Sequence, residues 1–209
     1  MTWNICCFII ESKKHITIIT WRTSMKHYTP SYHTLNKPMN GKILKAIDNV
    51  MDDYMDRHSK MFAMRLDVHL PEGTDQSKIM IFNHRFIEKE KNQGYDPAYV
   101  MTREIGEEKG NIHYHMALFL NGQKTESIKP HLDNAWTVLK NIRKTENKEG
   151  GKIDPCNEKK RNGFMIKRDD PDTRNLQAVQ QQMSYIAKAG QKANVKGKTY
   201  FTSRTRKKK

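Results

Sequence analysis

Residues 98–120 read AYVMTREIGEEKGNIHYHMALFL. Two runs rich in β-branched, aromatic and other apolar side chains, 98–105 and 111–120, flank the short polar segment GEEKG. A polar connection of this length between two strand-like runs predicts an antiparallel hairpin. The hairpin is the centre from which the rest of the fold can be placed.

Helical and strand-like periods alternate on both sides of this hairpin. Helices are expected over 40–59, 75–91, 128–142 and 174–189, a strand over 62–69, and short strands near 152–153 and 164–166. After the first helix, the order is β-α-β-β-α-β, the split βαβ pattern of a ferredoxin-like sheet. The sequence therefore predicts an α+β fold, a ferredoxin-like or RRM-like antiparallel sheet with helices packed on it.

The chain has 209 residues, with 38 Lys and Arg against 23 Asp and Glu, which gives a formal net charge of +15. This excess favours a polyanionic partner, with nucleic acid first and an acidic membrane surface second. The three cysteines form no CxxC pair, which argues against a disulfide framework and a structural zinc site and favours a reducing cytosol. The chain contains no apolar run of the roughly 18 residues that a membrane span needs. A soluble cytoplasmic protein without a membrane partner is expected.

The chain divides into one domain and two flanking segments. Residues 26–203 form the predicted domain, behind an N-terminal extension, 1–25, of uncertain order. The end of the chain, 204–209, reads RTRKKK and is expected to be a basic tail that adds nonspecific affinity for phosphate.

His113 and His115 lie two residues apart on a predicted strand, so both imidazoles emerge on the same face. If the turn is centred on 107–109, Glu104 lies opposite them and completes a set of two histidines and one carboxylate. Glu107 or Glu108 takes this place in another register. Mixed N and O donors with open positions suit Mg²⁺ or Mn²⁺, and zinc is the alternative. The plainer interpretation is that two histidines on a polar sheet face simply form hydrogen bonds.

The last predicted helix carries Tyr185 roughly opposite its apolar stripe, so this tyrosine is not needed for the core. Lys188 follows by one turn and Gln181 precedes by one turn, which places the three side chains on one polar face. A cation beside a tyrosine stabilises the phenolate, the form that attacks phosphorus. Alone, an exposed tyrosine beside a lysine is a common surface feature.

The combination of HYH on a strand and YxxK on a later helix, in a strongly basic domain, is more specific than either motif alone. The chain here resembles the HUH endonuclease superfamily, and specifically the replication initiators of filamentous (inovirus) phages, the YagK/YfjJ C-terminal family. The likeness covers most of 28–203 and weakens across 143–175. The residues that carry it are Arg65-Leu-Asp67, YVMTREIG at 99–106, HYHMALFLNG at 113–122, Trp136 and MSYIAKAGQK at 183–192.

The resemblance implies that His113, His115 and Glu104 bind a divalent metal, with Tyr185 as the nucleophile and Lys188 assisting. Proteins of this kind nick one DNA strand at an origin and stay attached through a 5′-phosphotyrosine, which starts rolling-circle replication. The substrate is then single-stranded or hairpin origin DNA, in a bacterial host cell, with the gene carried by a phage or mobile element. The chain has no GxxxxGK[ST] loop, so unwinding and synthesis are expected to fall to a host helicase and polymerase.

Further side chains are candidates for contacts to DNA phosphates or bases. The candidates for direct contacts are Arg65, Arg103, Lys109, Gln181 and Lys192, and the tail lysines add to them. Tyr99, Tyr114 and Trp136 are aromatic candidates for stacking on unpaired bases, although Trp136 lies close to an apolar helical stripe and fits the core better.

Three other functions compete with this hypothesis. A mobilisation relaxase or a single-tyrosine transposase uses the same chemistry, but relaxases place the tyrosine ahead of a three-histidine cluster, whereas Tyr185 follows the HxH pair. A non-catalytic DNA-binding or regulatory module would keep the fold and charge without the complete set of His113, His115, Tyr185 and Lys188. An RNA-binding sheet would carry stacking aromatics in place of the two histidines.

Overall fold

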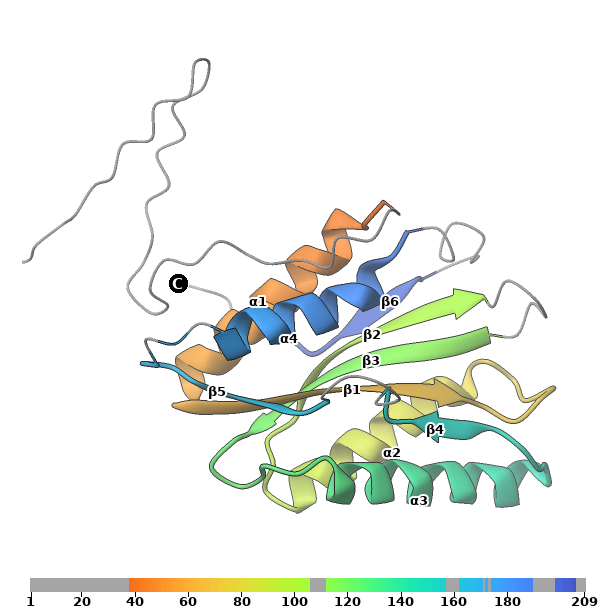
Figure 1. Cartoon of the computed structure of the whole chain (residues 1–209). Coiled ribbons are helices and arrows are strands. Elements are labelled where there is room, and N and C mark those ends of the chain that lie inside the picture. The colour runs from red at the N-terminus through yellow and green to blue at the C-terminus, as the bar shows by residue number, and fades with distance from the viewer. Residues whose placement is uncertain are drawn as a thin grey trace, which may run out of the picture.

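The computed structural model describes residues 38–105, 112–156, 162–170, 172, 174–189 and 198–205. It is an α+β structure in which helices pack on both faces of one antiparallel sheet (Figure 1). The helices are α1 (Gly41–Arg57), α2 (Lys78–Asn92), α3 (Lys129–Glu146), α4 (Arg174–Ser184) and the 3₁₀ turn η1 (Tyr185–Ala187). The strands are β1 (Lys60–His69), β2 (Ala98–Ile105), β3 (Ile112–Asn121), β4 (Lys152–Asp154), β5 (Phe164–Lys167) and β6 (Tyr200–Thr202). The predicted extension 1–25 and tail residues 206–209 lie outside the described residues.

The sheet follows the order β4-β1-β3-β2-β6, and β5 pairs with β1 beside β4. The first four strands reproduce the predicted split βαβ pattern, since β1 and β2 are separated in space by β3. β4 pairs with the carboxyl end of β1 and β5 with its amino end, so two short strands share one edge. The sixth strand, β6, extends the sheet beyond β2 and was not predicted.

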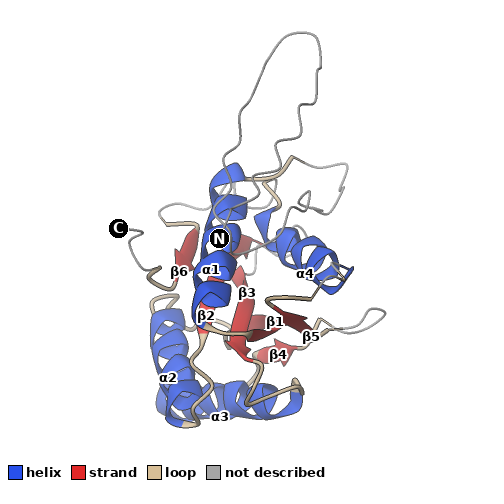
Figure 2. Cartoon of the chain, turned by 90° about the vertical axis from the view of Figure 1, so that its left-hand side faces the viewer, coloured by secondary structure: helices blue, strands red, loops and turns tan. Residues whose placement is uncertain are grey.

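Helices lie on both faces of the sheet, as the view along the strands shows (Figure 2), and each face has its own core. α2 and α3 cover one face and bury the side chains of β1 and β3 that include Phe62, Leu66 and Met116. α1 and α4 cover the other face and bury Ala63, Phe119 and further apolar side chains. β1 and β3 therefore carry apolar side chains on both faces along much of their length, whereas a sheet with one solvated face would alternate.

The face beneath α1 and α4 is apolar at one end and polar at the other. Near β5 its side chains are apolar and packed under the two helices. Toward the β2–β3 hairpin the cross-strand register places polar side chains on the same face: Arg65, Asp67, His69, Thr102, Glu104, His113, His115, Lys152 and Asp154. Because the side-chain period of a strand is two, this polar end follows directly from the sequence pattern of β1 and β3.

Two helix boundaries show how the chain reaches this polar end. Asn40 caps α1, and its side-chain oxygen accepts hydrogen bonds from the backbone N–H groups of Lys42 and Ile43. The backbone N–H of Asn40 also donates to the carbonyl of Ala187, which ties the start of α1 to η1. The amino end of α1 and the carboxyl end of α4 thus meet beside the polar part of the sheet.

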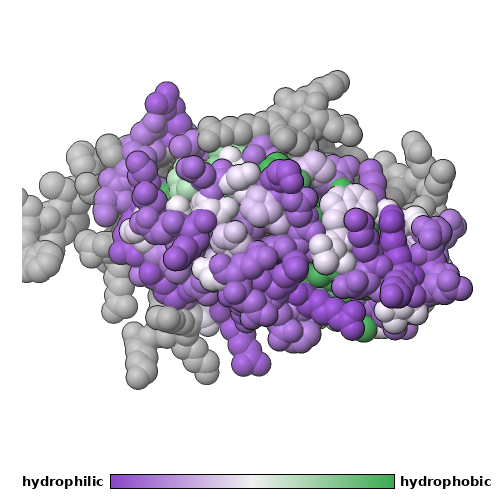
Figure 3. Space-filling model, turned by 90° about the horizontal axis from the view of Figure 1, so that it is seen from below, coloured by the Kyte–Doolittle hydropathy of each residue, from purple (hydrophilic) through white to green (hydrophobic). Residues whose placement is uncertain are grey.

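The surface over α2 and α3 is predominantly hydrophilic, with only scattered apolar spots (Figure 3). Among the described residues, Met80 and Ile81 are the large hydrophobic side chains that are exposed, at 41% and 37%. Two isolated apolar side chains do not form an apolar docking surface. Within the described part of the chain, no helix has the length and apolar character needed to cross a bilayer.

Candidate active site

Glu104, His113 and His115 converge at the polar end of the sheet. Glu104 lies directly opposite His113 in the β2–β3 register, as the hairpin prediction required, and Thr102 lies opposite His115. One potential ligand atom from each of the three side chains lies within 4.8 Å of the others. The Glu104 Oε2 atom is 2.9 Å from His115 Nε2 and 3.6 Å from His113 Nε2. Two imidazole nitrogens and one carboxylate in this arrangement fit a divalent metal ion with positions left for other ligands.

Asp67 holds His115 from the side opposite Glu104. Its Oδ1 atom lies 2.6 Å from His115 Nδ1 across the β1–β3 pairing. A carboxylate in close contact with Nδ1 restrains the imidazole ring and leaves Nε2 facing Glu104, an arrangement that is common behind metal-binding histidines. Burial by itself would lower the pKa of His115, but the neighbouring carboxylates of Asp67 and Glu104 raise it. Burial by itself would raise the pKa of Asp67, but His115 and Arg65 lower it.

Tyr185 reaches the same place from α4 and η1. Its ring lies edge-on to the imidazole of His115, with 5.9 Å between the ring centroids. Two cations lie over the tyrosine ring: the Lys188 Nζ atom is 3.4 Å from the centroid and the Arg65 guanidinium carbon is 4.3 Å from it. Cation–π contact of this kind positions an aromatic ring without requiring a hydrogen bond to its hydroxyl.

Lys188 approaches Tyr185 by a route different from the predicted one. The helix was expected to continue to residue 189, with Lys188 one α-helical turn after Tyr185. Instead α4 ends at Ser184, the chain tightens into η1, and Lys188 is extended, with φ −51° and ψ 130°. Lys188 also forms a bridge with Met39 next to the start of α1. The tighter turn brings its ammonium group back over the tyrosine ring.

Arg65 is fixed in the site by both its backbone and its side chain. The side-chain amide of Asn162 accepts from the Arg65 N–H at 2.9 Å and donates to the Arg65 carbonyl at 2.7 Å and to the carbonyl of Pro155. The guanidinium lies 3.6 Å from Asp67, and its side chain is 13% exposed. Burial by itself would lower the pKa of Arg65, but Asp67 raises it. Arg65, predicted as a contact to DNA, is therefore placed between Asp67 and Tyr185.

The other predicted DNA contacts are dispersed. Gln181 is exposed on α4, one turn before Tyr185. Arg103 pairs in register with Tyr114, so both side chains lie on the α2/α3 face, opposite the histidines. Lys109 and Lys192 lie outside the described residues.

The aromatic candidates for base stacking are mostly used in packing. Tyr114 is buried, and its hydroxyl donates a hydrogen bond to Gln76, which removes it from any base-stacking role. Trp136 packs against the α2/α3 core, as its place beside the apolar stripe suggested. Tyr99 is half-buried on the same face and accepts a hydrogen bond from Asn83.

Two residues of the site, Asp67 and His69, were not among the predicted site residues. The sequence places Arg65, Asp67 and His69 at alternate positions of one strand, and therefore on one face. The register of β1 with β3 and β4 brings them beside the histidines. The His69 ring stacks on His113 with 5.3 Å between centroids. Burial, His113 and Lys152 all lower the pKa of His69, which favours its neutral form.

The YagK/YfjJ C-terminal domain model matches residues 22–203, and the chain belongs to that family. No curated protein matches the chain. No solved structure matches it either.

Proposed function

We propose that this protein is a metal-dependent, single-tyrosine DNA endonuclease of the HUH superfamily, similar to the replication initiators of filamentous phages. The proposed reaction nicks one strand of single-stranded or hairpin origin DNA and starts rolling-circle replication. The observation that carries the proposal is the position of Tyr185, whose ring lies against His115 although the two residues come from different elements. The net charge of +15 supports a nucleic-acid substrate.

The donor set is suited to a cation such as Mg²⁺ or Mn²⁺. Glu104, His113 and His115 would hold it, and Asp67 would orient His115 through Nδ1. A divalent ion bound there supplies positive charge that polarises the scissile phosphate.

Tyr185 is the proposed nucleophile. Its hydroxyl oxygen forms a bond to the scissile phosphorus as the bond from phosphorus to the 3′-oxygen breaks. The tyrosine gives up its hydroxyl proton, the leaving oxygen takes up a proton, and no oxidation or reduction occurs. The product is a 5′-phosphotyrosine with a free 3′-hydroxyl, so the phosphodiester energy is kept for rejoining. Lys188 and Arg65 hold the ring and place positive charge where the DNA phosphate must approach.

Formation of a covalent adduct tests this proposal directly. The full-length protein is incubated with labelled single-stranded DNA carrying a candidate origin and Mn²⁺, and denaturing gels report any protein–DNA band. We expect a band with the wild type that Tyr185→Phe, His113→Ala or EDTA abolishes. Tyr99→Phe, which removes a hydroxyl on the opposite face of the sheet, is the matched control and should retain the band.

Two results would contradict the proposal. A band that persists in Tyr185→Phe assigns the nucleophile elsewhere. If the wild type binds origin-like DNA but gives no band on any such substrate, the protein acts as a DNA-binding or regulatory module on the same fold.

A further inference from the structure

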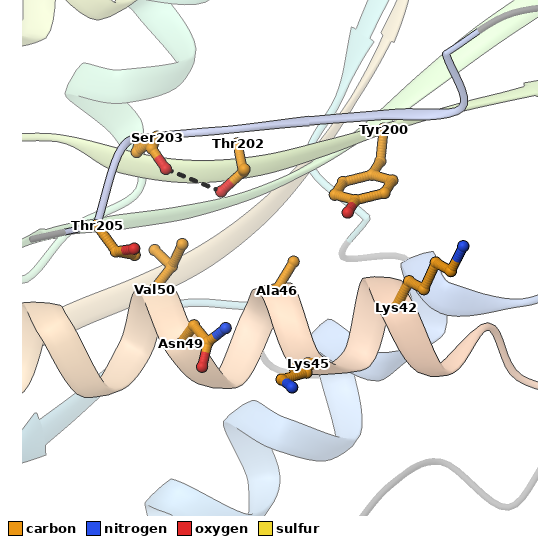
Figure 4. Close-up of a pocket in the computed structure, with 9 residues that line it drawn as sticks. All are labelled: Lys42, Lys45, Ala46, Asn49, Val50, Tyr200, Thr202, Ser203 and Thr205. Atoms are coloured by element: carbon orange, nitrogen blue, oxygen red, sulfur yellow. Dashed lines mark hydrogen bonds between the residues drawn. The ribbon is translucent and has the colours of Figure 1, made fainter. Parts of the chain in front are cut away.

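A second candidate binding surface lies between α1 and the edge strand β6. It is a groove of about 300 Å³ between the amino-terminal half of α1 and residues 200–205 (Figure 4). The residues that line it are Lys42, Lys45, Ala46, Asn49, Val50, Tyr200, Thr202, Ser203 and Thr205. In the close-up, Tyr200 and Thr202 of β6 point toward Lys42, Ala46 and Val50 of α1, whereas Lys45 lies on the side of the helix away from β6.

The chemistry of the groove matches a phosphodiester chain. Two lysines stand on the α1 wall, hydroxyl side chains follow one another along the β6 wall, and none of the nine lining residues carries a carboxylate. Lys42 and Lys45 are both exposed and stand at positions i and i+3 of α1, so they are neighbours on the surface of the helix. The ring of Tyr200 forms one end of the groove. It is half-buried and packs against the core beneath α1, so only its remaining exposed part can meet a base.

The sheet register connects this groove to the candidate active site. Tyr200 lies opposite Thr102, and Thr102 lies opposite His115, so the three side chains share one face of the sheet. Two inter-strand spacings of about 4.8 Å place the Tyr200 end of the groove about 10 Å from His115. A strand whose scissile phosphate lies at Tyr185 can therefore enter the groove within a few nucleotides.

We infer that the α1–β6 groove binds the backbone of the single-stranded DNA that flanks the scissile phosphate. Lys42 and Lys45 each neutralise one phosphate, and Tyr200 stacks on a base. The inference rests on the proposed function, because the nicking reaction defines which DNA flanks the scissile phosphate. Binding of DNA in the groove, however, requires neither a metal ion nor cleavage. It can therefore be tested separately.

The test measures binding of fluorescein-labelled dT20 to the full-length protein in EDTA, over a range of salt concentrations, by anisotropy. For a single strand, the slope of log K against log salt is about −0.7 per neutralised phosphate. The double variant Lys42→Gln/Lys45→Gln should therefore reduce the magnitude of the slope by about 1.4 and weaken binding about 10- to 30-fold at 0.1 M salt. The matched control, Lys140→Gln/Lys144→Gln, removes the same charge from exposed positions on α3 and should change binding less than about two-fold.

Tyr200 provides an independent measurement. Tyr200→Ala should weaken dT20 binding about ten-fold, and Tyr200→Phe, which keeps the ring, should bind as the wild type does. Thermal unfolding of each variant reports whether the fold is intact.

The outcomes separate this inference from the nickase proposal. The inference is overturned if the Lys42/Lys45 variant keeps the wild-type salt dependence of dT20 binding, or if the α3 control loses as much affinity. This holds even if the wild type forms the Tyr185 adduct. If the Lys42/Lys45 variant loses as much affinity for a 20-base-pair duplex as it loses for dT20, the assignment of the groove to single strands is wrong. A lower slope confined to the groove variant supports the groove, even in a protein that forms no adduct.

Discussion

The Asp67 carboxylate contacts the imidazole nitrogen of His115 that faces away from Glu104. Its Oδ1 atom lies 2.6 Å from His115 Nδ1, while His115 Nε2 faces Glu104. Substitution Asp67→Asn keeps the size of the side chain but removes the charge that holds the imidazole. We expect Mn²⁺ affinity, measured by calorimetry on the full-length protein, to fall by about 10-fold, at the lower end of the usual effect of such a partner.

Asp154→Asn is the matched control for this measurement. Asp154 lies opposite Asp67 in the β1–β4 pairing, but its carboxylate contacts Lys152 and the backbone N–H of Cys156. We expect it to leave Mn²⁺ affinity within about two-fold of the wild type, well below the effect of losing a partner of a ligand. Equal losses in the two variants would show that the general negative charge of this edge, not the contact to His115, supports metal binding.

The residues of the candidate site differ in how well the sequence predicts them. His113, His115 and Glu104 belong to one hairpin, so alternation along two strands and a short turn were enough to place them together. Asp67 and Arg65 join them through the pairing of β1 with β3, where 48 residues separate Asp67 from His115 in the chain. The predicted split βαβ order already places β1 beside β3, but it does not determine which residues of the two strands lie opposite each other. Asp67 was therefore not named as a site residue, and Arg65 was assigned to the DNA surface.

At the scale of elements, one ionic cluster joins the end of α1 to the loop before β2. The Asp96 carboxylate accepts hydrogen bonds from Arg57 at 2.6 Å and His58 at 2.7 Å, and its carbonyl accepts one from Tyr54. Partial burial by itself would raise the pKa of Asp96, but these two hydrogen bonds lower it. Asp96 has φ 45°, a left-handed conformation that asparagine also tolerates.

Asp96→Asn therefore tests the charge without altering the backbone. A carboxylate whose pKa is lower in the folded state adds stability above its usual value near 4, and this stability is lost as the pH falls through the lowered value. Because the Asp96 side chain is 49% exposed, we expect a loss of only about 0.5–1 kcal/mol in unfolding free energy at pH 7. Urea unfolding at pH 7 and pH 2.5 checks this. A difference between wild type and variant that persists at pH 2.5 would contradict the assignment.

A buried polar network joins α2 to α3 on the other face of the sheet. His131 is fully buried, and its Nδ1 lies 2.7 Å from Glu90 while its Nε2 lies 2.9 Å from the hydroxyl of Thr125. Asn134 donates to the second oxygen of Glu90. His131→Ala leaves one carboxylate oxygen of Glu90 buried without its imidazole partner and opens a cavity. We expect a loss of about 3 kcal/mol in unfolding free energy by urea titration.

The position of this network makes a second readout available. α2 and α3 lie on the face opposite the candidate active site, so His131→Ala should leave Mn²⁺ affinity unchanged under conditions where the variant is folded. A loss of less than about 1 kcal/mol would mean that the remaining partners satisfy Glu90.

The elements that the sequence predicted are those with long, regular periods. α1, α2 and α3, and strands β1, β2 and β3, bury continuous apolar stripes, and their periodicity was sufficient. β6 has only three residues, and its partner β2 is distant in the chain, so hydrogen bonding to an existing sheet edge determines it. The early end of α4 was also missed, because the contacts of η1 with the start of α1 outweigh local helix propensity.

The whole molecule places its two candidate binding features on one face of the sheet. β3 is a central strand, paired on both sides over most of its length, and it supplies both histidines. The Tyr200 end of the α1–β6 groove lies on the same face. A ligand held by β2 and β3 therefore connects strands that exist as a pair only in the folded protein, which gives metal binding a consequence for global stability.

Mn²⁺ should accordingly raise the unfolding temperature. A ligand that binds only the folded state contributes about 2.7 kcal/mol when its free concentration is 100 times its Kd. For a chain of this size, about 1 kcal/mol corresponds to 2–4 °C, so we expect a rise of about 5–10 °C by calorimetry relative to EDTA. His113→Ala removes one ligand and should abolish the rise, whereas His84→Ala, an exposed histidine on α2, should retain it. An equal rise in all three proteins would place the binding of Mn²⁺ outside the Glu104, His113 and His115 set.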